Sequence, residues 1–206
     1  MENKKHIVIV GGGFAGLELV KELNRSGKYH ITLVDMNNYN FFPPLLYQLA
    51  AGFMEPSSIS YPFRRLLRKY KNARFRMASL QEVIPAENKL ILSNGELSYD
   101  ILVMATGAES NFFGNKEVEE KAMPMKTVGD ALMLRNLVYT RLERATRTQD
   151  KEQRRKLLSF AIAGAGPTGV ELSGIFAEMK QNIMRKDYPE LTYDDLGDIY
   201  LIDGQK

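Results

Sequence analysis

Apolar residues near the N-terminus follow two patterns in succession. A short continuous apolar run at residues 6–10 is typical of a strand that is buried on both faces. Glycines interrupt the run, and apolar residues then recur at helical spacing until Gly27. A second apolar run, at residues 31–34, ends on Asp35. Strand, helix and strand within about 30 residues predict a βαβ unit.

The middle of the chain is less regular. Residues 37–60 are rich in aromatic residues and proline, and residues 62–71 carry the apolar and basic faces of an amphipathic helix. Asn94 and Gly95 form a turn signal in the region that follows. Three short strands are expected around this turn, at residues 75–83, 89–92 and 101–104.

The second half repeats the order of the first. Thr127 and Asp130 are spaced as a capping box, which predicts a helix over residues 131–147, and a polar link at residues 148–156 follows. The pattern then gives an apolar strand at 157–163, a glycine turn, a helix to about residue 186, and a strand at 199–202 that ends on Asp203. The chain therefore contains the same supersecondary pattern twice.

Composition narrows the functional classes. The 206 residues are 44% hydrophobic and 26% charged, as in a folded globular protein, and the net charge of +3 gives no case for nucleic-acid binding. No cysteine occurs, so thiolate metal sites and thiol nucleophiles are excluded from these residues, and we expect no metal. No apolar run reaches the length of a membrane span, and the N-terminal run resembles a strand and turn more than a signal peptide. We expect the chain to fold in the cytosol.

The first glycine pattern, Gly11-x-Gly13-x-x-Gly16, lies between the first strand and the first helix. A dinucleotide pyrophosphate requires free backbone amides at a helix N-terminus and no side chain in its way. Asp35 follows Gly16 by nineteen residues, where it can accept hydrogen bonds from a ribose. Together these features predict a dinucleotide site, with a ligand-free glycine turn as the alternative.

The second pattern, Gly164-x-Gly166-x-x-Gly169, predicts another such site. Its ribose acid would be Asp203, although it lies 34 residues beyond Gly169 because residues 187–198 intervene. A carboxylate there favours NADH over NADPH because it repels a 2′-phosphate, whereas Lys206 nearby argues the other way.

A third element supports the first two. The apolar strand at 101–104 ends in Ala105-Thr106-Gly107, where small residues let backbone approach a cofactor and Thr106 offers a hydroxyl. Together with the two glycine patterns, this segment resembles the flavoprotein reductases that bind two dinucleotides. A further set of motifs resembles the type II NADH:quinone oxidoreductases: Tyr39-Asn40-Phe41-Phe42-Pro43-Pro44-Leu45-Leu46-Tyr47-Gln48-Leu49-Ala50, Asn111-Phe112-Phe113-Gly114 and Gly166-Pro167-Thr168-Gly169-Val170-Glu171-Leu172.

This resemblance implies an α/β fold of two Rossmann-like units. The first is an FAD domain with a small β-meander at residues 1–113, and the second is the start of an NADH domain at residues 114–206. It also implies hydride transfer from NADH to FAD and electron transfer to a quinone, with Glu171 close to the reacting rings. The residues expected at the cofactors are Gly11, Gly13, Phe14, Ala15, Gly16, Asp35, Pro44, Gln48, Ala105, Thr106, Gly107, Gly164, Gly166, Pro167, Thr168, Gly169 and Asp203.

The family also sets expectations about partners and rivals. Its members continue past this length and end in a membrane-attaching segment, so we expect an N-terminal fragment that is inactive alone. The parent would lie on the cytoplasmic face of the membrane, and a homodimer is possible. Three alternatives stay open: a sulfide:quinone oxidoreductase, which would use cysteines; an NAD(P)H oxidase; and a non-catalytic dinucleotide-binding module.

Overall fold

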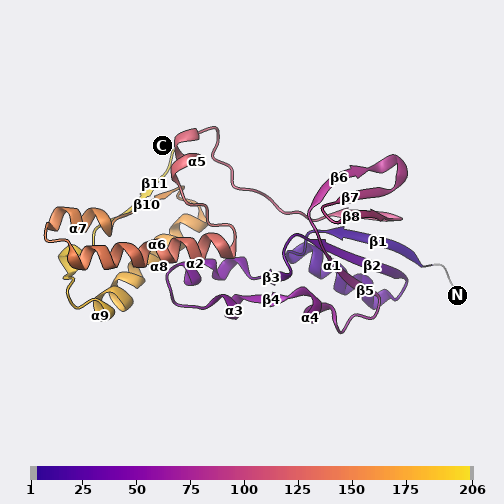
Figure 1. The fold of residues 1–206 in the computed structure, drawn as a ribbon, viewed down its shortest axis with the longest axis horizontal. Helices are drawn as coiled ribbons and strands as arrows, with labels where there is room; N and C mark the ends of the chain where they lie inside the picture. Colours follow the sequence, from indigo (N-terminus) through magenta and orange to yellow (C-terminus); the bar gives the residue numbers. More distant parts are fainter. Residues whose placement is uncertain (1–3, 205–206) are drawn as a thin grey trace. The chain divides into compact units, whose positions relative to one another are not determined.

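The computed structural model describes residues 4–204, apart from the side chain of Arg185. These residues fold into two units (Figure 1). The first contains the residues up to Phe41 together with Ser60–Glu109, and the second contains Phe42–Ile59 and the residues from Ser110 on. The sequence-based division at residues 113 and 114 places segment 42–59 in the first domain, whereas in the structure this segment folds with the second unit.

The first unit is built on a parallel sheet of the predicted βαβ type. Its strand order is β5-β2-β1-β9, with every neighbouring pair parallel, and β6, β7 and β8 form a separate antiparallel meander. The elements in chain order are β1 (Lys5–Val10), α1 (Phe14–Ser26), β2 (Tyr29–Asp35), β3 (Tyr39–Phe41), β4 (Ser60–Pro62), α4 (Phe63–Leu67), β5 (Ala73–Met77), β6 (Leu80–Ile84), the 3-10 turn η2 (Pro85–Glu87), β7 (Lys89–Leu92), β8 (Gly95–Ser98) and β9 (Ile101–Met104).

Layers on both faces of the sheet explain the continuous apolar run in β1. Ile7 and Ile9 belong to a core cluster with residues of α1 and α4. Val8 and Val10 point to the opposite face and pack in a cluster with residues of the meander. Because successive side chains of a strand point to opposite faces, a strand covered on both sides must be apolar at every position. The predicted α/β class and the predicted meander are both confirmed.

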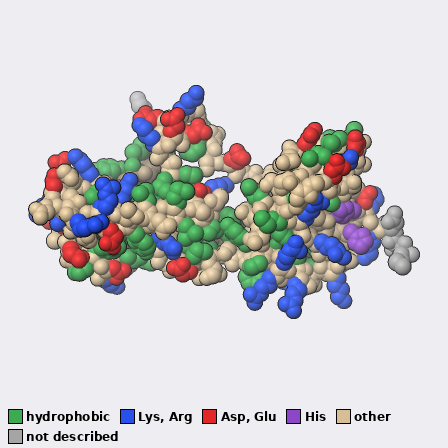
Figure 2. All heavy atoms as spheres, in the orientation of Figure 1, with side chains coloured by type: hydrophobic (Ala, Val, Ile, Leu, Met, Phe, Trp, Pro, Cys, Tyr) green, Lys and Arg blue, Asp and Glu red, His purple; other side chains and the backbone are tan. Residues whose placement is uncertain are grey.

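Two predicted elements of this unit are wrong in extent. The strand expected at 75–83 is two strands in different sheets: Ala78 N–H still bonds to the Asp35 carbonyl beside β2, whereas Ser79 N–H bonds to the hydroxyl of Ser93 after β7. The helix expected at 62–71 spans only Phe63–Leu67, and its first and last residues are the buried ones. Its basic side chains are exposed, and blue side chains gather over this part of the unit (Figure 2).

The second unit combines helices with a short parallel sheet, β10-β11. The stacked rings of Phe160 and Phe176, with centroids 4.3 Å apart, join β10 to α8 in its core. The elements in chain order are the 3-10 turn η1 (Pro43–Leu45), α2 (Leu46–Ala50), α3 (Pro56–Ile59), α5 (Lys116–Lys121), α6 (Val128–Arg147), α7 (Lys151–Leu157), β10 (Phe160–Ala163), α8 (Pro167–Met179), the π-helical turn η3 (Lys180–Met184), α9 (Arg185–Asp187), the 3-10 turn η4 (Tyr193–Asp195) and β11 (Ile199–Ile202).

The capping-box prediction is confirmed, but the polar link is not. Thr127 and Asp130 exchange the two side-chain-to-backbone hydrogen bonds of a capping box at the start of α6. Residues expected to be a link form helix α7, whose N-cap is Asp150, with the carboxylate accepting the N–H groups of Glu152 and Gln153. Because this helix continues to Leu157, the strand that was expected to begin there begins at Phe160 instead.

Candidate dinucleotide-binding loops

The first glycine loop connects β1 to α1 and is held against its neighbours by backbone contacts. Gly11 has φ +107° and donates its N–H to the Val34 carbonyl at 2.8 Å. A Cβ on Gly11 would lie 2.2 Å from the Ala105 carbonyl oxygen, and a Cβ on Gly16 would lie 1.9 Å from the Gly11 carbonyl oxygen. The first and third glycines of the pattern are therefore required by the fold itself.

Gly13 differs, because the protein does not require a glycine there. Its φ of −71° suits any residue, and a Cβ would meet no atom within 4 Å. Gly13 is the N-cap of α1 and supplies no side-chain cap to the helix amides. Space in front of an uncapped helix N-terminus suits a pyrophosphate, so the residues present fit a dinucleotide.

Asp35 is oriented toward this loop. Its Oδ2 accepts the Gly12 N–H at 2.7 Å, and its Oδ1 accepts the Asn37 N–H at 2.8 Å. The carboxylate is half-buried, and each oxygen keeps a second lone pair for another donor such as a ribose hydroxyl. The Asn40 side chain steadies the same loop by donating to the Gly12 carbonyl at 2.9 Å.

The Ala105-Thr106-Gly107 segment also lies at the first loop. Ala105 N–H donates to the Val10 carbonyl at 2.7 Å, which continues the pairing of β9 with β1. Thr106 and Gly107 come next and are exposed, and Gly107 has φ +75°. The structure therefore places this segment beside the glycine loop, as the sequence predicts.

The second glycine loop, between β10 and α8, has the same backbone geometry as the first, except that no atom lies within 4 Å of a Cβ position on Gly164. Gly164 has φ +101° and donates its N–H to the Ile202 carbonyl at 2.7 Å. A Cβ on Gly169 would lie 1.9 Å from the Gly164 carbonyl oxygen, whereas Gly166, with φ −68°, has no atom within 4 Å of its Cβ position. Pro167 occupies the first turn of α8, where its missing N–H costs nothing.

Asp203 occupies the position in this loop that Asp35 occupies in the first. Its Oδ2 accepts the Ala165 N–H at 2.8 Å, as Asp35 Oδ2 accepts the Gly12 N–H at 2.7 Å. The 34-residue separation from Gly169 therefore does not prevent the spatial match. Lys206, which argues against a preference for NADH, lies outside the described residues.

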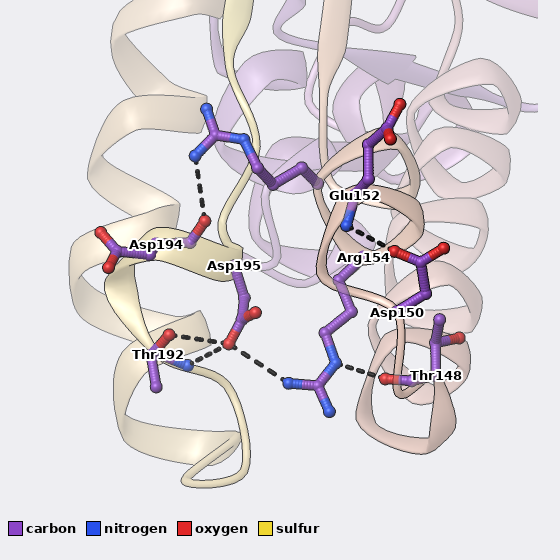
Figure 3. Close-up of polar contacts among 8 residues, drawn as sticks. Thr148, Asp150, Glu152, Arg154, Thr192, Asp194 and Asp195 are labelled. Carbon is purple, nitrogen blue, oxygen red and sulfur yellow. Dashed lines mark hydrogen bonds and ion pairs between the residues drawn. The ribbon is translucent and has the colours of Figure 1, made fainter.

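The intervening residues are fixed by a buried carboxylate, Asp195 (Figure 3). Its side chain is 2% exposed, and its Oδ2 accepts the N–H and the hydroxyl of Thr192, each at 2.8 Å. Arg154 of α7 approaches the same oxygen at 3.4 Å and donates to the Thr148 carbonyl. The backbone hydrogen bond from Thr192 is the main reason that the pKa of Asp195 lies below its usual value. This network anchors η4 to α7 shortly before β11 begins.

Pro44 and Gln48, expected beside the flavin, belong to the second unit. Pro44 is exposed in η1, and Gln48 lies on α2 with its side-chain oxygen buried and without a hydrogen-bond partner among the described residues. The neighbouring Tyr47 donates its hydroxyl to Thr168 Oγ1 at 3.2 Å, a contact with the second glycine loop. Glu171 is exposed on α8 and its side chain makes no hydrogen bond with the described residues, so its role stays a prediction.

Sequence reasoning missed three contributors to the loops. Asn40 holds the first loop from β3, the ring of Phe63 fills the space beside Gly12, and Tyr47 reaches Thr168. Asn40 and Tyr47 stand in the motif that carries the family resemblance, but their partners are 28 and 121 residues away. Only the tertiary fold brings such pairs together.

A hollow in the second unit lies away from the glycine loops. It has a volume of about 410 Å³ and is lined by Arg155, Lys180, Gly197 and Asp198, among others. Gly197 and Asp198 directly precede β11, and Lys180 and Arg155 donate hydrogen bonds to them, whereas the loop and Asp203 lie at the carboxyl ends of the two strands. Ligands of parallel α/β sheets bind at the carboxyl ends, so the loop is the better candidate than the hollow.

Comparison with known proteins decides the family. The family model for pyridine nucleotide-disulphide oxidoreductases matches residues 5–200. The chain belongs to this family. The chain is 37% identical over 186 residues to the type II NADH:quinone oxidoreductase Ndh of Mycobacterium tuberculosis. The match covers 88% of the chain and 40% of that relative.

Solved structures agree with the sequence comparison. The family member is similar to NDH2 from Plasmodium falciparum in complex with NADH, with a TM-score of 0.87 and 29% identity over 98% of this chain and 42% of that one. It is less similar to the sulfide:quinone oxidoreductase of Aquifex aeolicus, with a TM-score of 0.67 and 26% identity over 88% of this chain and 41% of that one. The chain thus spans about 40% of the length of each of these three relatives.

The described part of the chain contains no helix that is both long enough and apolar enough to cross a membrane.

Proposed function

We propose that this chain supplies the FAD loop and the NADH loop of a type II NADH:quinone oxidoreductase. The observation that carries the proposal is a geometry that occurs in both units. In each unit, a carboxylate at the end of one strand (β2 or β11) accepts an N–H from the glycine loop that follows the neighbouring strand (β1 or β10). The chemistry that FAD supplies in such enzymes is hydride uptake from NADH and delivery of two electrons to a quinone.

The first loop is the proposed FAD site. The amides behind Gly13 would hold the pyrophosphate, and Asp35 would accept the ribose hydroxyls. Thr106 would add its exposed hydroxyl from the end of β9, next to the loop. Phe14, Ala15 and Gly16 form the first turn of α1 and supply the helix N-terminus.

The second loop is the proposed NADH site, with Gly166 at the pyrophosphate and Asp203 at the adenosine ribose. The similarity of the chain to the structure of NDH2 in complex with NADH supports NADH as one of the two ligands. Glu171, on the second turn of α8, would lie toward the nicotinamide. The 206 residues contain no cysteine, so a dithiol acceptor of the kind used by disulfide reductases is absent from them, and a quinone fits better as acceptor. Contact with a membrane surface and pairing into a homodimer are proposed for the parent enzyme.

Equilibrium binding to the purified chain tests the assignment of cofactors to loops. We expect Asp35→Ala to weaken FAD binding and Asp203→Ala to weaken NADH binding, each about tenfold, because each removes hydrogen bonds to a charged group. Each variant should leave the other cofactor's dissociation constant unchanged. A crossed result would reverse the assignment, and binding unaffected in both variants would contradict it.

The flavin spectrum adds a test of the hydride step. Purified chain reconstituted with FAD is recorded before and after anaerobic NADH. Type II activity requires bleaching of the flavin band in the parent enzyme, and for this chain alone we expect weak flavin retention and little bleaching. Rapid bleaching would show that hydride transfer is complete within these residues, contrary to that expectation. Retained flavin that NADH never bleaches in the parent enzyme would favour a non-catalytic module.

A further inference from the structure

A tyrosine from the aromatic segment contacts the second glycine loop. Tyr47, on α2, donates its hydroxyl to Thr168 Oγ1 at 3.2 Å, and both residues belong to the second unit. Thr168 is the second residue of α8, directly after Pro167, so its hydroxyl lies at the uncapped end of that helix. Family resemblance places this segment beside the flavin, and nothing in that resemblance predicts a polar contact with the other loop.

The helix that carries Tyr47 is firmly held within its unit. Leu46, Leu49 and Ala50 of α2 are buried, with 2% exposure or less, and α2 packs against α6 and α8. Gly52 follows with φ +80°, and a Cβ there would lie 2.1 Å from the hydroxyl oxygen of Tyr139 on α6. The packing of α2 therefore holds Tyr47 in position next to Thr168.

The direction of the hydrogen bond gives it a consequence. A phenol is a more acidic hydroxyl than an alcohol, so Tyr47 is the donor and Thr168 Oγ1 the acceptor. A hydroxyl has one proton and two lone pairs, so the acceptance leaves the proton of Thr168 available to another partner. At a helix N-terminus that lacks a side-chain cap, the natural partner for this proton is an anion.

We propose that Tyr47 is a positioning residue of the NADH loop, and this inference rests on the proposed function. By donating to Thr168, Tyr47 directs the threonine proton outward, toward a phosphate of the bound dinucleotide. The contact ties recognition of the pyrophosphate to the aromatic segment 42–59, and Tyr47 itself does not need to touch the ligand.

Isothermal titration of the 206-residue chain with ADP, adenosine and NADH tests the inference. ADP carries the pyrophosphate, and adenosine does not. We expect Tyr47→Phe, which removes one hydroxyl, to weaken ADP and NADH about fivefold and to leave adenosine unchanged, as expected for one lost hydrogen bond. Thr168→Ala should weaken ADP more, and adding Tyr47→Phe to it should have no further effect. Thr168→Ser keeps the hydroxyl and should restore the sensitivity to Tyr47→Phe.

Tyr200→Phe is the matched control, because Tyr200 loses a comparable contact, to Asp198 Oδ2 at 3.3 Å, at the start of β11. It should bind ADP as the wild type does. Wild-type affinity for ADP in Tyr47→Phe, or equal losses for ADP and adenosine, would overturn the role of Tyr47 while leaving the NADH site standing. A wild-type chain that binds neither ADP nor NADH would overturn both proposals.

Discussion

Gly166 offers a way to separate what the fold requires from what a ligand requires. Its φ is −68°, and no atom lies within 4 Å of the position that a Cβ would take. Alanine at a helix N-cap is less favourable than glycine by up to about 1 kcal/mol, whereas a compatible Gly→Ala change stabilises by about 0.4–1 kcal/mol through the unfolded chain. The two effects nearly cancel, so Gly166→Ala should change the free energy of unfolding by less than about 0.5 kcal/mol.

The same substitution should strongly weaken NADH binding. If a phosphate occupies the open space at Gly166, the added methyl group displaces it from the helix amides. Loss of one hydrogen bond to a charged group costs about 1.5–3 kcal/mol, which raises the dissociation constant roughly ten- to a hundredfold. For Gly169→Ala we expect the main effect on stability rather than on NADH binding. Its Cβ would lie 1.9 Å from a backbone oxygen, so we expect the free energy of unfolding to fall by about 2 kcal/mol or more.

Urea unfolding followed by circular dichroism, paired with NADH titration, measures both quantities on each variant. Gly174→Ala serves as the control, since Gly174 lies on α8 with open space around it. That change should stabilise the helix by up to about 1 kcal/mol and leave NADH binding unchanged. Wild-type NADH affinity in Gly166→Ala would place the pyrophosphate elsewhere. A loss of stability near that of Gly169→Ala would refute the open-space reasoning.

Three further changes test other parts of the second unit. Asp203→Asn should raise the affinity for NADPH relative to NADH, because it removes the charge that repels a 2′-phosphate; an unchanged ratio in paired titrations would remove Asp203 from that role. Asp195→Asn should lower the free energy of unfolding by about 2 kcal/mol at pH 7. The pKa of Asp195 is lowered in the folded state, so this stability is present above the ordinary value of 3.8 and is lost as the pH falls through the folded value; urea midpoints of wild type and variant should converge there. Thr127→Ala, which removes the capping box of α6, should cost about 1 kcal/mol by the same assay, and no loss would contradict the cap.

The sequence predicted the elements whose local pattern and burial agree. The strand at 199–202 has the predicted bounds, and α1 ends at Ser26 before Gly27, which caps the helix in the left-handed conformation. Helix α7 was missed because Lys151–Leu157 is nearly all polar, with no apolar stripe to reveal its period. The local signals for α7 are the N-cap Asp150 and the ion pair of Lys156 with Glu152, and such signals predict a helix less strongly than a buried apolar face does.

The candidate site was predictable to the extent that it is built from backbone. At Gly11, Gly16 and Gly169 a Cβ would collide with a backbone carbonyl. These positions therefore require glycine, and the resulting glycine pattern can be recognised in the sequence. The contacts of Asn40 and Tyr47 were not predictable, because each depends on a partner that only the tertiary fold brings near. The 34 residues between Gly169 and Asp203 argued against Asp203 as the ribose acid of the second loop. In the structure, the pairing of β11 with β10 brings Asp203 to that loop in spite of this separation.

Residues 42–59 fold with the second unit although residues of the first unit flank them in sequence, and this affects how the two units can evolve. The chain leaves the first unit after β3 and re-enters it at β4, which pairs antiparallel with β3. In between, it supplies the buried Leu46, Leu49 and Ala50 to the other unit. A gene segment starting at residue 110 would therefore encode the second unit without the buried residues of segment 42–59. Neither unit can be exchanged by a single crossover, so the two are expected to have been inherited and diversified together.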